Sequence, residues 1–96
     1  GEPIDAHRAE RLGMVNKVVP DDELEKQTMA FAERLAGGAT RAIGLTKSAM
    51  YKGWGEDLDT TFDYQAVAQT LAAQTDDQQE GRKAFLEKRP PEFKGR

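Results

Sequence analysis

Residues 75–96 read TDDQQEGRKAFLEKRPPEFKGR, a stretch that contains a helix start, a helix end and a short basic tail. Thr75 is followed three residues later by a glutamine, which resembles a capping box, and the two aspartates after Thr75 add negative charge where the helix dipole favours it. The proline pair further along cannot continue a helix. The stretch therefore predicts a helix that starts after Thr75 and ends at about Lys88 or Arg89, followed by a tail over residues 90–96.

The end of the chain differs in charge from the rest. The whole sequence has 96 residues, with 14 Lys and Arg against 17 Asp and Glu, and its net charge is −3. Residues 82–96, in contrast, hold six basic and two acidic side chains. We expect no nucleic-acid partner, because the acidic remainder of the chain would repel a phosphate backbone.

The opening of the chain predicts a short helix and an extended connector. In IDAHRAERLG, residues 4–13, Asp5 is a candidate N-cap and Gly13 lies where a helix would stop. MVNKVVP, residues 14–20, has β-branched residues around a polar pair and closes on a proline. That composition favours an extended segment.

Three further helical patterns fill the middle of the chain. ELEKQTMAFAERLA carries an apolar stripe, follows Asp21 and Asp22, either of which can cap it, and is ended by two glycines. ATRAIGLTKSAMYKGW places alanines, an isoleucine and a methionine on one helical face. EDLDTTFDYQAVAQTLAAQ predicts the next helix, with an apolar spine formed by Leu58, Phe62, Ala66 or Val67, and Leu71.

We predict an all-α fold of about five short-to-medium helices in a single helical domain over residues 1–96. Residues 1–20 form a connector helix and extended segment, residues 21–89 form helices, and residues 90–96 form the basic tail. Alanine supplies much of the hydrophobic fraction, so the core should be shallow unless another surface completes it. Trp54, between two glycines, is expected to fold over this core, and the alternative is a recognition residue.

The sequence also predicts a location. It contains no cysteine, which excludes disulfides and thiolate metal sites and agrees with a reducing compartment. No apolar run approaches the roughly 20 residues that cross a bilayer, and no signal-peptide pattern opens the chain. We therefore expect a soluble cytoplasmic protein with no membrane partner.

Phe85 and Lys88 form the candidate binding pair. Three residues apart on a helix, they would share a face, where a flat ring could pack on Phe85 and a phosphate could meet the Lys88 ammonium. The alternative is a core phenylalanine and a solvated lysine near a helix C-terminus. His7 has no nucleophile or second metal ligand near it in sequence, so it is expected at the surface. Capping explains the clustered carboxylates, and we predict no catalytic residue and no metal site in this chain.

Longer stretches of the sequence resemble one family. GEPIDAHRAERLGMVNKVVPDDEL, residues 1–24, is similar to the segment after the catalytic core in the crotonase superfamily, the enoyl-CoA hydratases and isomerases. AERLAGGATRAIGLTKSAM, residues 32–50, fits the same family. The ending TDDQQEGRKAFLEKRPPEFKGR is similar to the C-terminus of that superfamily. The resemblance covers the whole chain in the same order and spacing.

The resemblance implies the helical C-terminal region of a crotonase-like fold, with the N-terminal spiral core absent. In that family the core supplies the oxyanion N–H groups and the acidic catalytic residues, which would lie upstream of Gly1. The helical region builds trimer contacts and helps to cover the acyl-CoA site. The family pattern assigns Phe85 and Lys88 to the adenine and phosphate end of coenzyme A. The sequence departs from many relatives at Gln65, where they carry glutamate, and from some at Gln69, where they place an aromatic residue near the adenine.

The resemblance therefore implies part of a protein that hydrates or isomerises the double bond of enoyl-CoA thioesters in fatty-acid or related acyl-CoA metabolism. The expected partners are the acyl-CoA substrate in the complete enzyme and further copies of the chain. No covalently bound cofactor is expected, only the coenzyme A moiety of the substrate. The chain should be inactive alone. The alternative is an independent helical oligomerisation or interaction module without a cofactor role, because helix packing would select the same apolar stripes.

Overall fold

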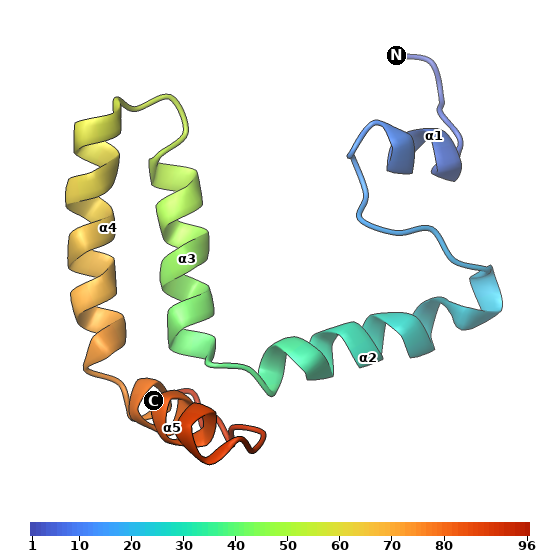
Figure 1. Ribbon diagram of the computed structural model, residues 1–96. Helices are drawn as coiled ribbons and strands as arrows, with labels where there is room; N and C mark the ends of the chain where they lie inside the picture. Colours follow the sequence, from blue (N-terminus) through green and yellow to red (C-terminus); the bar gives the residue numbers. More distant parts are fainter. The chain divides into compact units, whose positions relative to one another are not determined.

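Five α-helices and one 3-10 turn make up the regular structure of the computed structural model, which describes residues 1–96 (Figure 1). The prediction of an all-α fold with about five helices is confirmed. None of the helices is both long enough and apolar enough to span a lipid bilayer. Contacts divide the chain into two units, residues 1–32 and residues 33–96. The elements are α1 (Ala6–Arg11), η1 (Asp21–Glu23), α2 (Leu24–Ala36), α3 (Thr40–Lys52), α4 (Leu58–Ala73) and α5 (Asp76–Glu87).

The start and end of α1 are those that the sequence predicts. The Asp5 carboxylate accepts a hydrogen bond from the Arg8 N–H at 2.8 Å, so Asp5 is the N-cap. Gly13 has a φ of +72°, and its N–H donates to the Glu10 carbonyl, while the Met14 N–H donates to Ala9. This pair of bonds is the Schellman closure that glycine favours at a helix end.

The connector between α1 and α2 contains no regular structure from residue 17 to residue 20. The Val18 N–H donates to the Glu10 carboxylate at 2.8 Å, which ties the connector to α1. The prediction that Asp21 or Asp22 caps the next helix is wrong. Pro20 has the extended backbone of a cap (φ −55°, ψ 146°), and both aspartates lie inside the 3-10 turn, where a residue is too far along to act as the N-cap.

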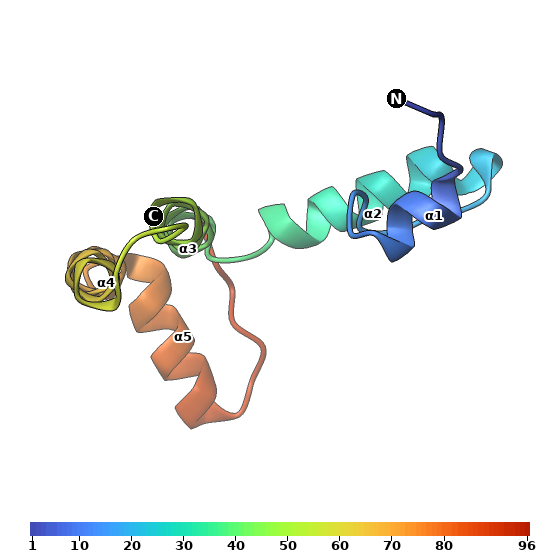
Figure 2. The same ribbon diagram turned by 90° about the horizontal axis from the view of Figure 1, so that it is seen from above.

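In the second unit, α3 and α4 lie side by side and run in opposite directions (Figures 1 and 2). Asp57 caps α4 by accepting the Thr60 N–H at 2.9 Å and the Thr60 hydroxyl at 2.8 Å. The Thr60 N–H lowers the pKa of the Asp57 carboxyl. The Tyr64 hydroxyl donates to Ser48 Oγ at 2.9 Å and links the two helices.

Small residues form the face of α4 that packs against α3. Ala68 is buried, and Thr61 and Ala72 are half-buried. The large residues of the predicted spine point elsewhere, since Phe62 is 57% exposed and Leu71 is 46% exposed. Small side chains let the two helices approach closely, and the chain contains no surface that covers the larger ones.

The core is shallow, as predicted. Its buried apolar residues are Ala68 and Ala84. Trp54 is 89% exposed, so the prediction that it folds over the core is wrong. Trp54 instead borders an apolar groove along α3, together with Ile43, Met50 and Tyr51.

Thr75 starts α5 as predicted, but the capping box is incomplete. The Thr75 hydroxyl oxygen accepts the Gln78 N–H at 3.2 Å. The Thr75 N–H donates to the Ala72 carbonyl at 3.1 Å, so the Gln78 side chain does not occupy it. One reciprocal bond of the capping box is therefore replaced by a turn bond.

Candidate functional site

The chain reverses direction at Lys88, directly after α5. Lys88 has φ 53° and ψ 40°, and it is the one non-glycine residue with positive φ. Its N–H donates to the Phe85 carbonyl at 3.2 Å, and the Arg89 N–H donates to the Ala84 carbonyl at 3.0 Å. These are the two bonds of a Schellman closure, at a position that glycine usually occupies. A left-handed conformation costs an L-residue roughly 1–2 kcal/mol, so lysine is an unfavourable choice here.

The end of α5 differs from the predicted one. The helix ends at Glu87, and Lys88 lies outside it. The prediction that Phe85 and Lys88 share a helical face is therefore wrong, because the left-handed residue breaks the helical spacing. The two residues are instead joined through the bond between the Lys88 N–H and the Phe85 carbonyl.

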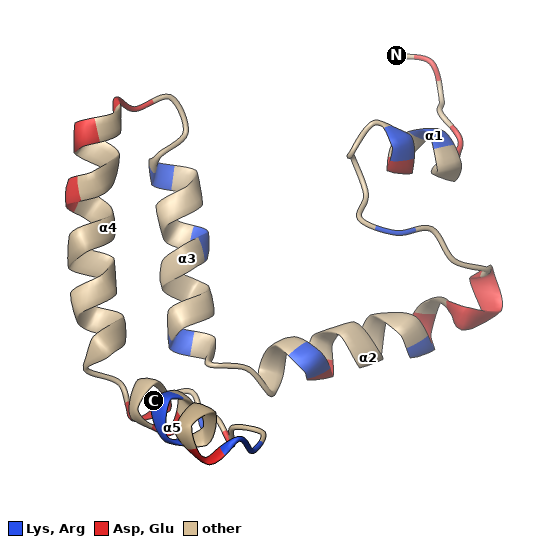
Figure 3. Cartoon of the chain, in the orientation of Figure 1, with Lys and Arg blue, Asp and Glu red and all other residues tan.

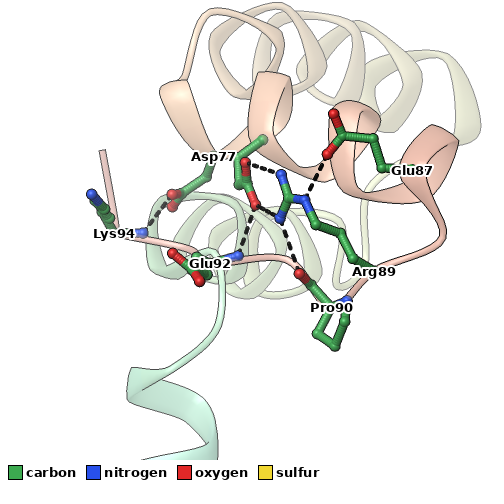
Figure 4. Close-up of polar contacts among 7 residues, drawn as sticks. Asp77, Glu87, Arg89, Pro90, Glu92 and Lys94 are labelled. Atoms are coloured by element: carbon green, nitrogen blue, oxygen red, sulfur yellow. Dashed lines mark hydrogen bonds and ion pairs between the residues drawn. The ribbon is translucent and has the colours of Figure 1, made fainter.

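After Lys88, the tail runs back along α5 (Figure 2). Glu80 holds its beginning: the carboxylate accepts Arg89 Nη1 at 2.6 Å, Arg89 Nη2 at 3.0 Å and the Glu92 N–H at 2.9 Å. Arg89 also donates to Glu87 at 2.7 Å and to the Pro90 carbonyl at 3.1 Å (Figure 4). The tail is thus tied to the helix by a bidentate ion pair and a backbone bond.

Electrostatics agree with this geometry. The bonds from Arg89, together with the Glu92 N–H, lower the pKa of Glu80 from 4.5 to about 2. The same pair, with Glu87, raises the pKa of Arg89 above its usual range. Glu80 and Arg89 are therefore both charged across the ordinary pH range.

Asp77 holds the end of the tail. Its side chain is buried, and its carboxylate accepts the Lys94 N–H at 2.6 Å and the Gly95 N–H at 2.8 Å. The Asp77 N–H donates to the Arg96 carbonyl at 3.1 Å. Gly95 has a φ of +73°, and a Cβ there would lie 2.5 Å from Thr40 Oγ1, so only glycine fits. We call this arrangement the C-terminal clasp, formed by Asp77, Glu80, Arg89, Glu92, Lys94 and Gly95.

Sequence reasoning missed the clasp. It assigned Asp77 to the helix dipole and gave Glu80 no role. The available signal was the spacing of the two acids, three residues apart and so on one face of the helix, with backbone amides following a proline pair. That signal does not say which way the tail turns.

Phe85 borders a cavity of about 420 Å³ between α5, the tail and the beginning of α3. Arg82, Gly81 and Phe93 also line it, and Lys88 does not. The Phe85 ring is 82% exposed. Phe85 is thus not a core residue within these 96 residues, and its role in binding stays a prediction.

Four basic residues near the C-terminus form no ion pair: Arg82, Lys83, Lys88 and Lys94. Arg89 is neutralised by Glu80 and Glu87, and Arg96 lies 3.6 Å from Asp76. Figure 3 shows the basic and acidic residues gathered together around α5 and the tail. The four unpaired cations are the charge that remains for an anionic ligand.

The other candidate residues lie apart from the clasp. His7 is exposed on α1, as predicted. No group of three or more His, Cys, Asp or Glu side chains is arranged to hold a metal ion. Gln65 and Gln69 lie on α4 and line the groove between α3 and α4.

Comparisons identify the class of protein that this helical arrangement belongs to. The family model of enoyl-CoA hydratase/isomerase matches residues 1–96, and the chain belongs to that family. It is 41% identical over 93 residues to enoyl-CoA hydratase domain-containing protein 3, mitochondrial, from Mus musculus, covering 95% of this chain and 30% of the relative. It is 40% identical over 90 residues to crotonyl-CoA hydratase from Syntrophomonas wolfei, covering 94% of this chain and 35% of the relative.

A solved structure has the same fold. The crystal structure of an enoyl-CoA hydratase from Geobacillus kaustophilus superposes with a TM-score of 0.93 at 37% identity, covering 99% of this chain and 36% of that one. The chain thus spans about a third of the length of the relatives that it matches. The resemblance that the sequence indicated is confirmed.

Proposed function

We propose that these 96 residues are the C-terminal helical part of an enoyl-CoA hydratase or isomerase and contribute oligomer contacts and part of the coenzyme A site. The reaction of the complete protein would be hydration or isomerisation of the double bond of an enoyl-CoA thioester, in fatty-acid or related acyl-CoA metabolism. The family supports action on coenzyme A thioesters. The chain alone is proposed to be inactive, since the resemblance assigns the oxyanion donors and catalytic acids to the remainder of the relatives.

Lys88 is the single observation that carries the proposal. A lysine occupies a left-handed position where glycine would cost less. Unfavourable backbone geometry of this kind clusters at functional sites. Its ammonium forms no ion pair, and the neighbouring Phe85 ring is exposed. An unpaired cation and an open aromatic ring, carried by residues whose backbones are hydrogen-bonded to each other, suit a ligand that carries a purine and phosphates.

A titration with coenzyme A, followed through backbone amide shifts, tests the proposal. Shifts should cluster at residues 82–89 in the unaltered chain and shrink in Lys88→Ala. Lys83→Ala is the matched control. Lys83 also forms no ion pair and lies in the same part of the chain, so its substitution removes the same charge. Equal losses in the two variants, or no shifts at millimolar coenzyme A, would contradict the proposed site.

Oligomer contacts are the second part of the proposal. From residue 64 to residue 75 the sequence has no charged side chain, and Val67 and Leu71 are exposed within that stretch. An uncharged stretch of helix with exposed apolar side chains is typical of a packing surface. The same observation favours the alternative function, an interaction module without a coenzyme A role, and the titration above separates the two.

The location in the cytoplasm stays a proposal. It rests on the composition of the chain, and the name of the Mus musculus relative assigns that protein to mitochondria.

A further inference from the structure

We propose that Glu80 is a positioning residue: by holding Arg89 and the Glu92 amide, it fixes Lys88 in the left-handed conformation and so sets where the Lys88 ammonium stands relative to Phe85. The inference rests on the proposed function, since it concerns the same contact with coenzyme A. Glu80 itself is not proposed to touch the ligand.

Lys88 is held from both sides. On its N-terminal side, its N–H donates to the Phe85 carbonyl within the last turn of α5. On its C-terminal side, the Arg89 guanidinium and the Glu92 N–H are bound to the Glu80 carboxylate, two and a half turns earlier on the helix. A tail fixed in this direction requires the reversal at Lys88. Released from Glu80, lysine would relax towards conformations that L-residues prefer.

Glu80 and Glu87 make a natural comparison. Both lie on α5 and both bind Arg89. Glu87 makes one bond to Arg89, two residues away in sequence, and holds no tail amide. Glu80 makes three bonds that cross from the helix to the tail, over nine to twelve residues, and its side chain is 22% exposed against 46% for Glu87. Of these two acids, Glu80 is therefore the one placed to decide the direction in which the tail leaves Lys88, while Asp77 holds the far end of the tail.

The first test uses the chain without ligand and compares Glu80→Gln with Glu87→Gln. Backbone carbon shifts report the conformation of Lys88, and amide exchange reports the bond from the Arg89 N–H to the Ala84 carbonyl. Glu80→Gln should remove the left-handed signature and speed exchange at Arg89 by about tenfold. Glu87→Gln should stay within about twofold of the unaltered chain. A left-handed Lys88 in Glu80→Gln would overturn the proposal, whatever coenzyme A does.

The second test measures coenzyme A affinity in the same variants. Each removes one negative charge near a polyanion, so general electrostatics would tighten binding in both. Positioning predicts that Glu80→Gln binds roughly three- to tenfold more weakly than Glu87→Gln, and that this difference disappears when Lys88→Ala is added to each. A difference that persists without the lysine would mean that Glu80 acts by another route, and the proposal would be overturned.

Failure of the proposed function has a separate signature. If Lys88→Ala leaves coenzyme A affinity unchanged while Glu80→Gln still frees Lys88, the coenzyme A role of the lysine is wrong, and the positioning claim falls with it. The control of the Lys88 backbone by Glu80 would in that case stand as a property of the fold.

Discussion

At the scale of single residues, Lys88 concentrates the unusual features of the chain. It has left-handed backbone geometry, an unpaired ammonium and a place directly after the last turn of α5. Glycine in the same place would relieve the backbone and remove the charge. At this position the residue that would best stabilise the helix end, glycine, differs from the residue that would bind an anionic ligand, lysine.

Lys88→Gly should stabilise the helix end locally. We expect the free energy of opening at the Arg89 amide to rise by about 1 kcal/mol, which corresponds to roughly fivefold slower exchange. The greater freedom of glycine in the opened chain reduces this gain. Hydrogen exchange at Arg89 measures it, with Lys83→Gly as the control that should open the helix more readily. Unchanged or faster exchange in Lys88→Gly would show that the left-handed lysine is not strained.

The sequence could name Phe85 and Lys88 but not their geometry. The choice rested on helical spacing, whereas the helix ends at Glu87. The left-handed residue of a Schellman closure is usually glycine and rarely lysine. Nothing local in EKRPP therefore predicts a left-handed residue directly before Arg89. Pro90 indicated only that the helix must stop.

At the scale of elements, the clasp joins α5 to the tail that follows it. Two carboxylates in the first two turns of α5, Asp77 and Glu80, bind the tail. Five hydrogen bonds from the tail end on these two carboxylates. Glu80 accepts two from the Arg89 guanidinium and one from the Glu92 N–H, and Asp77 accepts the Lys94 and Gly95 N–H groups. Carboxylates that accept backbone N–H groups bind them more strongly than neutral acceptors do. Loss of either acid should release part of the tail.

Asp77→Asn should release the end of the tail. The amide can accept with only one of its two heteroatoms, which leaves the Lys94 or the Gly95 N–H without its partner. The docked tail should lose about 1–3 kcal/mol of stability in this variant, measured as faster hydrogen exchange at both amides. Asp76→Asn is the matched control, because Asp76 is 74% exposed and reaches only Arg96, at 3.6 Å. Equal effects in the two variants would contradict the role given to Asp77.

Acid should release the beginning of the tail. The pKa of Glu80 is about 2 in the folded chain against 4.5 ordinarily, so protonation favours the undocked tail. The contribution of Glu80 is fully present above pH 4.5 and is lost as the pH falls through about 2. The amide shift of Glu92 followed by pH titration measures this transition. Glu80→Gln should lack it, and an identical transition in that variant would assign the effect to another group.

Most helices were predictable because local signals mark them: Asp5 and Thr75 cap helices, and glycines or prolines follow the ends of α1, α2, α3 and α5. The end of α4, where Gln74 is the C-cap, carries no such signal. Which face of α4 packs against α3 was harder to predict from the sequence. An apolar stripe says which side of a helix avoids water, but not whether the chain contains the surface that covers it. Phe62 and Leu71 belong to such a stripe and remain exposed.

At the scale of the whole molecule, eighteen large hydrophobic side chains are exposed and two alanines are buried among the apolar residues. A chain of 96 residues that buries so little needs another surface to remove apolar area from water. Its relatives are about three times as long. Membership of the family and the exposure of these faces support the same proposal, a helical part that packs on further protein.

Self-association follows from that exposure. Light scattering should detect assemblies of the isolated chain at high concentration, and Leu71→Lys should raise the dissociation constant by about tenfold, because it places a charge in an apolar contact. Thr70→Lys adds the same charge at an exposed polar position and should have a smaller effect. A strict monomer at every concentration would contradict the proposed oligomer contacts.

The most direct test of the coenzyme A site is the affinity of Lys88→Gly for coenzyme A. Because this variant should hold its helix end more tightly than the unaltered chain, weaker binding cannot be assigned to unfolding. We predict that Lys88→Gly binds coenzyme A about tenfold more weakly, as expected for the loss of one charge-assisted contact to phosphate. Affinity equal to that of the unaltered chain would show that Lys88 does not contact the coenzyme, and the proposed site would be wrong.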